Sequence, residues 1–315
     1  MIGRRAALKK SLLGVASLFL PACSEKIPIK VGVHPWIGYE SLQLAQDLGY
    51  FRNNIELIRN ASASSTIESL ANGVLDAGAL TLDEVLTLLD QGTDLTIVLV
   101  FDISAGADKL ISRDSIRTLG DLRGKRIAYE ANTVGSLMLQ KSLQLAGLRL
   151  ENVIPVDAAV GEEQVALWRN EVVDAVITYE PTASLLTAES GRVLLDSRDF
   201  PDMIFDVLAV RTDRLPAIQS QLKQLIAGHF SALQYINVNY GDAIHRIASH
   251  QNIGYTEVIH SIKGIRLPNR QENCRLLQLG SRLHIAANEV QQIMLEKGLL
   301  KQSLEMNHLI SNRFC

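Results

Sequence analysis

The chain has 315 residues, of which 47% are hydrophobic and 21% are charged, a globular composition with enough length for two lobes with buried cores. This composition excludes a disordered or fibrous chain. The net charge of −3 provides no basic surface to neutralise a phosphate backbone, which argues against nucleic-acid binding.

The first 22 residues predict an export signal. Basic side chains within residues 4–10 precede an apolar run over 12–20, which is too short to span a bilayer. Residues 20–23, Leu-Pro-Ala-Cys, resemble the lipobox of bacterial lipoproteins, so we expect a lipid anchor at Cys23, on the periplasmic or cell-surface side of the membrane. Because Pro21 is unusual in a lipobox, a plain signal peptide and an uncleaved anchor are the alternatives. Residues 4–9 also resemble a twin-arginine signal, and the Sec route remains open.

The rest of the chain contains two further cysteines and no second candidate membrane segment. Later apolar runs, such as 95–101 and 175–178, have the length of strands and end in polar residues. Cys274 and Cys315 show no framework spacing, so we expect both to be unpaired, with a bridge between them as the alternative.

From Ile29 onward, strand-like runs alternate with amphipathic segments of helix length. The first series covers residues 29–33, 40–48, 55–58, 66–72, 76–80, 82–89 and 95–101. After a loop at 119–124, the second series covers residues 126–129, 134–146, 153–156, 162–169, 174–178, 181–189 and 193–195. This alternation is typical of mostly parallel sheets covered by helices. One more strand is expected at 205–210, and the chain from Leu215 onward is expected to be almost entirely helical.

The two series share a motif. Residues 72–81, Asn-Gly-Val-Leu-Asp-Ala-Gly-Ala-Leu-Thr, match residues 170–178, Asn-Glu-Val-Val-Asp-Ala-Val-Ile-Thr, with one residue deleted. Asp76 and Asp174 lie 98 positions apart (174 − 76 = 98), which favours one helix-to-strand unit in each lobe. Chance similarity between two common turns is the alternative.

These elements predict an α/β fold with two lobes, each a mostly parallel sheet with helices on both faces. A helical tail cannot form a sheet of its own, so we expect it to pack on the first lobe, with chain crossings near 107–111 and 206–211. The expected organisation is a signal peptide at 1–22, the first part of lobe 1 at 23–107, lobe 2 at 108–205, and a return strand and helical tail completing lobe 1 at 206–315. A cleft between such lobes is a common place for a ligand.

Aromatic and acidic residues follow several predicted strands. Ligands of open parallel sheets bind beyond the carboxyl ends of the strands. These positions hold His34-Pro35-Trp36, Thr81, Phe101-Asp102-Ile103-Ser104, Tyr129-Glu130 and Tyr179-Glu180. In three places an aromatic residue precedes an acid, which suits a nitrogen-rich or cationic ligand. The alternative is that the aromatic side chains complete the core and the acids favour helix N-termini.

Two predicted helix starts combine hydroxyl groups with free backbone amides. Ser65 lies in the Ser-Ser-Thr run at 64–66, and Thr133 lies in the Asn-Thr-Val-Gly-Ser run at 132–136. Such helix starts can hold an oxygen atom or an anion, while each residue taken alone is also explained as an N-cap.

Several longer motifs together resemble one known family. They are His-Pro-Trp-Ile-Gly-Tyr-Glu at 34–40, Leu-Ala-Gln-Asp-Leu-Gly-Tyr-Phe at 44–51, Asp-Ile-Ser-Ala-Gly-Ala-Asp at 102–108, Asp-Leu-Arg-Gly-Lys-Arg at 121–126 and Tyr-Glu-Pro at 179–181. As a set they resemble the nitrate/sulfonate/taurine-type substrate-binding family, which is also linked to thiamine-pyrimidine precursor binding proteins. The resemblance covers roughly residues 29–215. It is specific for the family and not for a ligand.

The resemblance implies a two-lobed, type II-like periplasmic-binding-protein fold that closes around a solute and hands it to the permease and ATPase of an ABC importer. By the same resemblance, the cleft would be lined by Trp36, Ser65, Thr81, Asp102, Ser104, Asp108, Glu130, Thr133 and Glu180. His34, Tyr39, Tyr129 and Tyr179 are secondary candidates. These loops hold four carboxylates and no basic residue except Lys109, an environment that repels a dianion. We therefore favour an amine, a urea-like molecule or a pyrimidine over nitrate, sulfonate or taurine.

Two other functions stay open beside import. A pyrimidine-precursor synthase of similar fold uses a cysteine-rich segment and iron, whereas the three cysteines here are dispersed and the histidines lack metal-ligand spacing. We therefore expect no catalytic residue, no metal and no cofactor. A sensor subunit that reports to a membrane signalling protein would have the same sequence features as an importer component. A monomer is expected, because each lobe must be presented to the permease.

Overall fold

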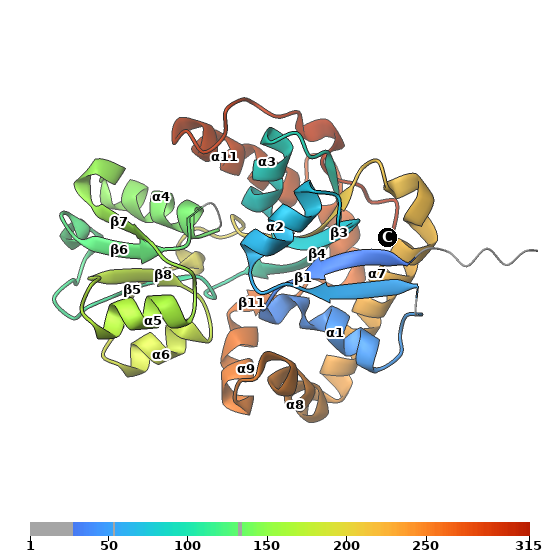
Figure 1. The fold of residues 1–315 in the computed structure, drawn as a ribbon, viewed down its shortest axis with the longest axis horizontal. Helices are drawn as coiled ribbons and strands as arrows, with labels where there is room; N and C mark the ends of the chain where they lie inside the picture. The colour runs from blue at the N-terminus through green and yellow to red at the C-terminus, as the bar shows by residue number, and fades with distance from the viewer. Residues whose placement is uncertain (1–27, 53, 132–133) are drawn as a thin grey trace, which may run out of the picture.

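The computed structural model describes residues 28–52, 54–131 and 134–315, and it places two sheets in two lobes (Figure 1). The sheet of the first lobe has the strand order β11-β4-β10-β3-β1-β2. Its strands are β1 (Ile29–Val33), β2 (Ile55–Arg59), β3 (Ala77–Thr81), β4 (Leu95–Ser104), β10 (Phe205–Arg211) and β11 (Ile265–Arg266). β3 and β4 are buried along their whole length, as expected for strands covered on both faces.

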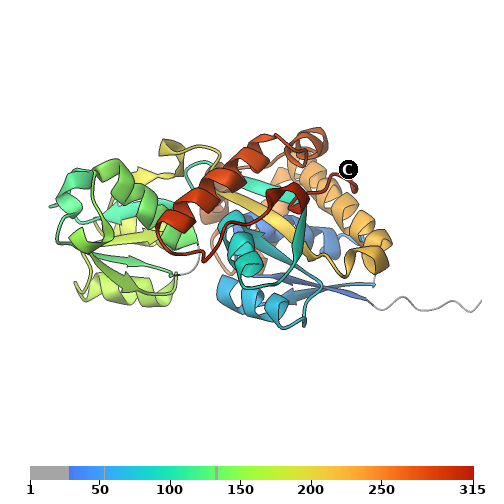
Figure 2. The ribbon, with the colours of Figure 1, turned by 90° about the horizontal axis from the view of Figure 1, so that it is seen from above.

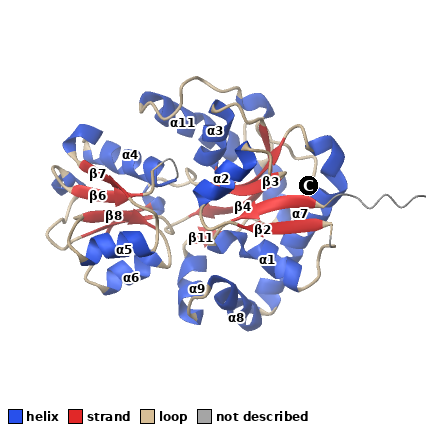
Figure 3. Cartoon of the chain, in the orientation of Figure 1, coloured by secondary structure: helices blue, strands red, loops and turns tan. Residues whose placement is uncertain are grey.

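The sheet of the second lobe has the strand order β7-β6-β8-β5-β9. Its strands are β5 (Lys109–Ser112), β6 (Arg126–Tyr129), β7 (Ile154–Asp157), β8 (Ala175–Thr178) and β9 (Arg192–Asp196). Helices cover both sheets (Figure 3). The α/β fold class predicted from the sequence is therefore confirmed.

Both sheets are mixed, and most of their strands point the same way, as predicted. β10 runs antiparallel to its neighbours β3 and β4, and β5 runs antiparallel to its neighbours β8 and β9. β10 and β5 are the strands with which the chain enters a sheet after crossing between the lobes. Strand direction depends on where the crossing enters the sheet, which a local hydrophobic pattern does not encode.

Helices of the first lobe precede and follow the second lobe in sequence. They are α1 (Glu40–Asp47), α2 (Ala63–Ala71), α3 (Leu82–Asp90), α7 (Leu215–Val238), α8 (Tyr240–Gln251), α9 (Tyr255–Lys263), α10 (Arg270–Leu276) and α11 (Arg282–Glu296). The second lobe contains α4 (Val134–Ala146), α5 (Glu162–Arg169) and α6 (Thr182–Ala188). None of the helices within the described ranges combines the length and the hydrophobicity that a bilayer crossing requires.

The tail after β10 is less helical than predicted. β11 interrupts it and pairs with β4, and beyond α11 the chain forms only a 3₁₀ turn at Met306–His308 before Ile310 bridges Ile97 of β4. These backbone groups pair with the edge of a sheet that is distant in sequence, which overrides local helix propensity.

The helix α11 contacts both lobes. It packs on α3 of the first lobe and on α4 of the second, and Figure 2 shows it in red reaching towards the green second lobe. Leu86 of α3, Val290 of α11 and Leu139 of α4 belong to one buried apolar cluster. The tail therefore packs on the first lobe as expected and also joins it to the second.

The chain crosses between the lobes twice. It leaves β4 for β5 over residues 105–108 and returns through residues 200–204 to β10. The return lies before the crossing expected at 206–211, because those residues form the buried strand β10 inside the first sheet. Two crossings of this kind provide a hinge about which lobes can move.

The repeated helix-to-strand motif makes the same contact in both lobes. The carboxylate of Asp76 accepts a hydrogen bond from the backbone of Lys30 next to β3, at 2.9 Å. The carboxylate of Asp174 accepts one from the backbone of Arg126 next to β8, at 2.8 Å. The unit is therefore used once in each lobe, and in each it joins the entering turn to the neighbouring parallel strand.

Candidate functional site

A pocket with an empty volume of about 370 Å³ lies between the two lobes. It is lined by His34, Trp36, Ala63, Thr81, Glu84 and Asp206 from the first lobe, by Asp108, Glu130, Val134 and Tyr179 from the second, and by Ile204 of the returning crossing. Most of these residues follow the carboxyl ends of parallel strands, where the loops of both sheets meet. We call it the cleft pocket.

Two aromatic side chains join the lobes at the cleft pocket. The Trp36 ring packs edge to face against the Tyr179 ring, with centroids 5.2 Å apart. Trp36 Nε1 donates a hydrogen bond to Asp102 Oδ2 at 3.1 Å, which fixes the indole orientation. A Cβ atom on Gly38 would lie 1.7 Å from this carboxylate oxygen, so only glycine leaves space for the contact. The indole is therefore held rigidly by its own lobe while it contacts the other.

Asp102 and Asp206 form a buried acidic pair, of which Asp206 lines the pocket and Asp102 does not. They are opposite each other in the antiparallel β4–β10 pairing, and both side chains are buried. Burial raises the pKa of Asp102 to about 8, and burial together with repulsion from Asp102 raises the pKa of Asp206 well above its ordinary value. The Tyr39 hydroxyl donates to Asp206 Oδ1 at 2.5 Å. This pair therefore retains a proton near neutral pH.

Further carboxyl groups face the pocket from both lobes. Burial and repulsion from Asp83 raise the pKa of Glu84 to about 8, and burial raises the pKa of Asp108 to about 6. Burial and the charge of Asp157 raise the pKa of Glu130. Asp108 Oδ2 is buried and has no hydrogen-bond partner among the described residues, which makes it an available acceptor.

The cleft pocket is lined by acids and by no basic group that is charged at pH 7, among the described residues. Among the described residues that line it, four carry carboxyl groups and none carries an ammonium or guanidinium group. Burial lowers the pKa of His34 to about 4, so this imidazole is neutral at pH 7 and does not offset the acids. The lining is therefore suited to hydrogen-bond donors and positive charge.

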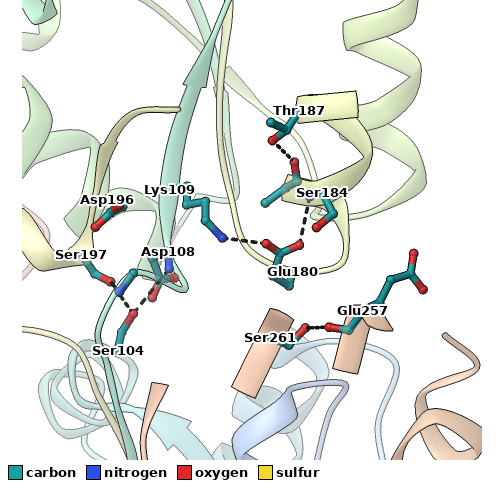
Figure 4. Close-up of polar contacts among 12 residues, drawn as sticks. Ser104, Asp108, Lys109, Glu180, Ser184, Thr187, Asp196, Ser197, Glu257 and Ser261 are labelled. Carbon is teal, nitrogen blue, oxygen red and sulfur yellow. Dashed lines mark hydrogen bonds and ion pairs between the residues drawn. The ribbon is translucent and has the colours of Figure 1, made fainter. Parts of the chain in front are cut away.

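Glu180 lies in a wider cavity beside the cleft pocket, with an empty volume of about 970 Å³. Its carboxylate pairs with Lys109 Nζ at 2.7 Å and accepts a hydrogen bond from the Ser184 amide at 2.9 Å (Figure 4). Ser261 of α9 lines the same cavity from the first lobe. The Glu180 carboxylate is therefore already paired within the second lobe, and it lines the outer cavity and not the cleft pocket.

Ser104 lies at the crossings and does not line the cleft pocket. Its hydroxyl is hydrogen-bonded to the Ser197 hydroxyl at 2.7 Å (Figure 4). The Ser197 hydroxyl also accepts a hydrogen bond from the Gly106 amide at 2.7 Å. These bonds tie the outgoing chain to the returning chain. The serine at position 104 is therefore explained by its hydrogen bond at the crossings between the lobes.

The predicted binding residues lie in several different places. His34, Trp36, Thr81, Asp108, Glu130 and Tyr179 line the cleft pocket. Asp102 and Tyr39 support it from below, and Glu180 lines the outer cavity. Ser65 forms a capping box with Ser62 at the start of α2, and Tyr129 packs against the main apolar cluster, so neither lines the pocket. Thr133 and the lipidation residue Cys23 lie outside the described residues.

Sequence reasoning missed two of the acids. Glu84 accepts the Thr81 amide at 2.9 Å as part of a capping box, and the Thr-x-x-Glu spacing was the available signal. Asp206 is the one acid in strand β10, and its neighbours up to Val210 are apolar, which is itself an indication of a buried functional group. Ala63, Val134 and Ile204 carried no such signal. Within the described ranges, no group of three or more His, Cys, Asp or Glu residues is arranged to hold a metal ion.

Comparison with known proteins relates the chain to binding proteins. The sequence profile of the NMT1-like family matches residues 22–250. A Brucella abortus protein named as a binding protein is 25% identical over 236 residues, which is 71% of each chain.

Solved structures share the fold. The periplasmic aliphatic sulphonate binding protein SsuA from Escherichia coli aligns with a TM-score of 0.74 at 16% identity, over 90% of this chain and 97% of that chain. A desulfurization enzyme, DSZB, aligns with a TM-score of 0.68 at 16% identity, over 91% of this chain and 97% of that chain. At these identities the likeness concerns the fold, which hosts both binding and catalysis.

Proposed function

Because the chain belongs to the NMT1-like family and is a solute-binding protein of the ABC importer type, we propose a class of solute for it. The proposed solute is a small nitrogenous molecule, such as an amine, a urea-like compound or a pyrimidine. The observation that carries this proposal is the lining of the cleft pocket, which has four carboxyl groups and, among the described lining residues, no ammonium or guanidinium group.

Electrostatics separate the two ligand classes. A buried carboxylate is costly unless it is paired, so a ligand with N–H donors or positive charge would offset the cost in Glu84, Asp108 and Asp206. A sulfonate would place a like charge near Asp108, whose pKa of about 6 leaves it mainly ionised at pH 7, and it would offer no N–H donor or positive charge to Glu84 and Asp206. The Escherichia coli structural neighbour is named for aliphatic sulphonates, and the acids argue for a different solute here.

The aromatic lining of the pocket suits a small, flat molecule. The edge-to-face pair of Trp36 and Tyr179 supplies apolar contact from both lobes. A solute held between acids of the first lobe and Asp108 or Glu130 of the second would stabilise the closed arrangement of the lobes, which a permease can recognise.

We propose a monomer that is anchored through an acylated Cys23 on the outer face of a bacterial membrane. Metabolic labelling with a fatty acid tests the anchor: label is expected on the parent and not on a Cys23→Ser variant, and equal labelling of both would contradict it.

A thermal-shift screen tests the ligand class. Ligand-free protein is heated with amines, ureas and pyrimidines, and separately with nitrate, sulfonates and taurine. A ligand at about 100 times its Kd adds roughly 2.7 kcal/mol, which raises the melting midpoint by several degrees. We expect shifts with the nitrogenous compounds only. The shift should disappear in Asp206→Asn and persist in Glu68→Gln, which neutralises an exposed acid outside the pocket. A shift with oxyanions alone would contradict the proposal.

We also propose that binding occurs without chemical conversion, although a desulfurization enzyme shares the fold. Mass spectrometry should recover the bound solute unchanged after long incubation, and a product would favour catalysis. Adjacent permease and ATPase genes would favour import, whereas an adjacent signalling gene would favour the sensing alternative.

A further inference from the structure

The two cysteines that follow the second lobe come together on the first lobe, although they lie 41 positions apart in the sequence (315 − 274 = 41). Cys274 lies in α10 and Cys315 is the last residue of the chain, and Figure 1 marks the C-terminus on the first lobe. Arg270 lies one helical turn before Cys274, and its Nη1 donates to the Cys315 carbonyl oxygen at 3.4 Å. The C-terminal residue therefore lies on the face of α10 that carries Cys274.

The residue before each cysteine is anchored. Asn273 is buried, and its side-chain amide exchanges two hydrogen bonds of 2.8 Å with the backbone of Val100 in β4. Phe314 is 5% exposed and packs in the apolar cluster of β1, β4 and α7. The Cys315 amide donates to Asn312 at 3.1 Å, which closes a turn. Neither cysteine is carried by a freely moving segment of the backbone.

The side chains of the two cysteines also interact. Partial burial raises the pKa of the Cys315 thiol to about 12, and the neighbouring Cys274 side chain adds to the rise. Both cysteines are free, Cys274 is partly exposed and Cys315 is exposed, so a soluble thiol oxidant can reach the pair. An exported protein works in an oxidising compartment, where adjacent accessible thiols are converted to disulfides.

We infer that Cys274 and Cys315 form an intramolecular disulfide after export, which fastens the C-terminus to α10. The inference rests on the export that is part of the proposed function and is independent of the solute.

The oxidant is a disulfide, either a protein disulfide oxidant or oxidised glutathione. One cysteine thiolate attacks a sulfur atom of the oxidant, forming a mixed disulfide and releasing one oxidant thiol. The second cysteine thiolate attacks its partner in that mixed disulfide and releases the other oxidant thiol. The pair loses two electrons and two protons, and the disulfide of the oxidant is reduced to two thiols.

Peptide mapping of the full chain, expressed with its own N-terminus and recovered from the exported fraction, tests the link. Free thiols are alkylated in acid before digestion with trypsin, which releases residues 271–275 and 314–315 as separate peptides. We expect one linked species whose mass is that of both peptides less two hydrogen atoms. Alkylated forms of both peptides without the linked species would overturn the inference.

Two matched variants and a reductant extend the test. Cys274→Ser and Cys315→Ser should each abolish the linked peptide and expose the remaining thiol to alkylation. Reduction should lower the melting midpoint of the parent by about 5 °C or more, because the bond closes a long loop, and should leave both variants unchanged. An equal response of parent and variants to the reductant would contradict the inference.

Fractionation of the same culture separates this inference from the proposed function. If the chain is not exported, the proposed function fails, and equilibration of the purified chain with oxidised glutathione then tests the pair directly: a linked peptide supports the pairing, and its absence overturns it. If the chain is exported and binds solute without the link, only the disulfide inference fails.

Discussion

Replacement of Asp102 by asparagine should stabilise the ligand-free protein at pH 8. Asp102 is fully buried, and burial raises the pKa of its carboxyl group from 3.8 to about 8. A carboxyl group whose pKa is higher in the folded state favours folding while it is protonated, so its contribution is complete below pH 4 and is lost as the pH rises to about 8. Each tenfold difference in proton affinity between the folded and unfolded states corresponds to about 1.4 kcal/mol, which sets an upper limit of about 6 kcal/mol for this group.

The asparagine variant removes this loss while keeping an oxygen that can accept the hydrogen bond of Trp36 Nε1. Asp102 and Asp206 titrate together, so part of the pH dependence remains with Asp206 after the substitution. We therefore expect a gain of about 2 kcal/mol in the free energy of unfolding at pH 8, below the upper limit. Urea unfolding of ligand-free protein at half-unit steps from pH 4 to 8 measures it. The parent should lose stability with rising pH and Asp102→Asn should lose less, while Glu68→Gln should follow the parent. Identical profiles of Asp102→Asn and the parent would refute the reasoning.

Three further perturbations test other parts of the structure. Gly38→Ala should lower the melting midpoint and abolish solute binding, because its Cβ would overlap the buried carboxylate of Asp102. Gly241→Ala is the control, since a Cβ there meets no atom within 4 Å. Melting curves and binding calorimetry compare the two variants. Burial depresses the pKa of His34 from 6.5 to about 4, so the folded protein binds a proton there less readily than the unfolded chain and loses stability as the pH falls from 6.5 to 4. His34→Asn should reduce this loss in acid-unfolding curves. Lys109→Met should destabilise the protein by about 1 kcal/mol more than the double variant with Glu180→Gln, since the single change leaves a carboxylate unpaired; equal denaturation midpoints would contradict this.

Local sequence patterns predicted the elements well. β1, β6, α4 and α5 begin and end where the periodicities predict, because each is a short, strongly patterned segment. His34, Trp36, Thr81, Glu130 and Tyr179 line the pocket because residues after parallel strands meet at one edge whatever the detailed packing.

Features that depend on distant pairing were not predictable in this way. Asp206 faces Asp102 only through the register of β10 on β4, which joins residues 104 positions apart (206 − 102 = 104). The role of Ser104 depends on Ser197 in the returning chain, and β11 exists because the edge of β4 offers unpaired backbone groups. A residue pattern within one segment contains no information on such partners.

The central claim is that the acids of the cleft pocket receive a nitrogenous solute, and the proton balance of binding tests it directly. With a compound that binds, titration calorimetry at pH 7 in two buffers of different ionisation enthalpy gives the number of protons exchanged. A donor or cation lowers the pKa values of the buried acids, including Asp102 and Glu84 at about 8, so binding should release protons. Tight binding of an oxyanion with proton uptake would contradict the account.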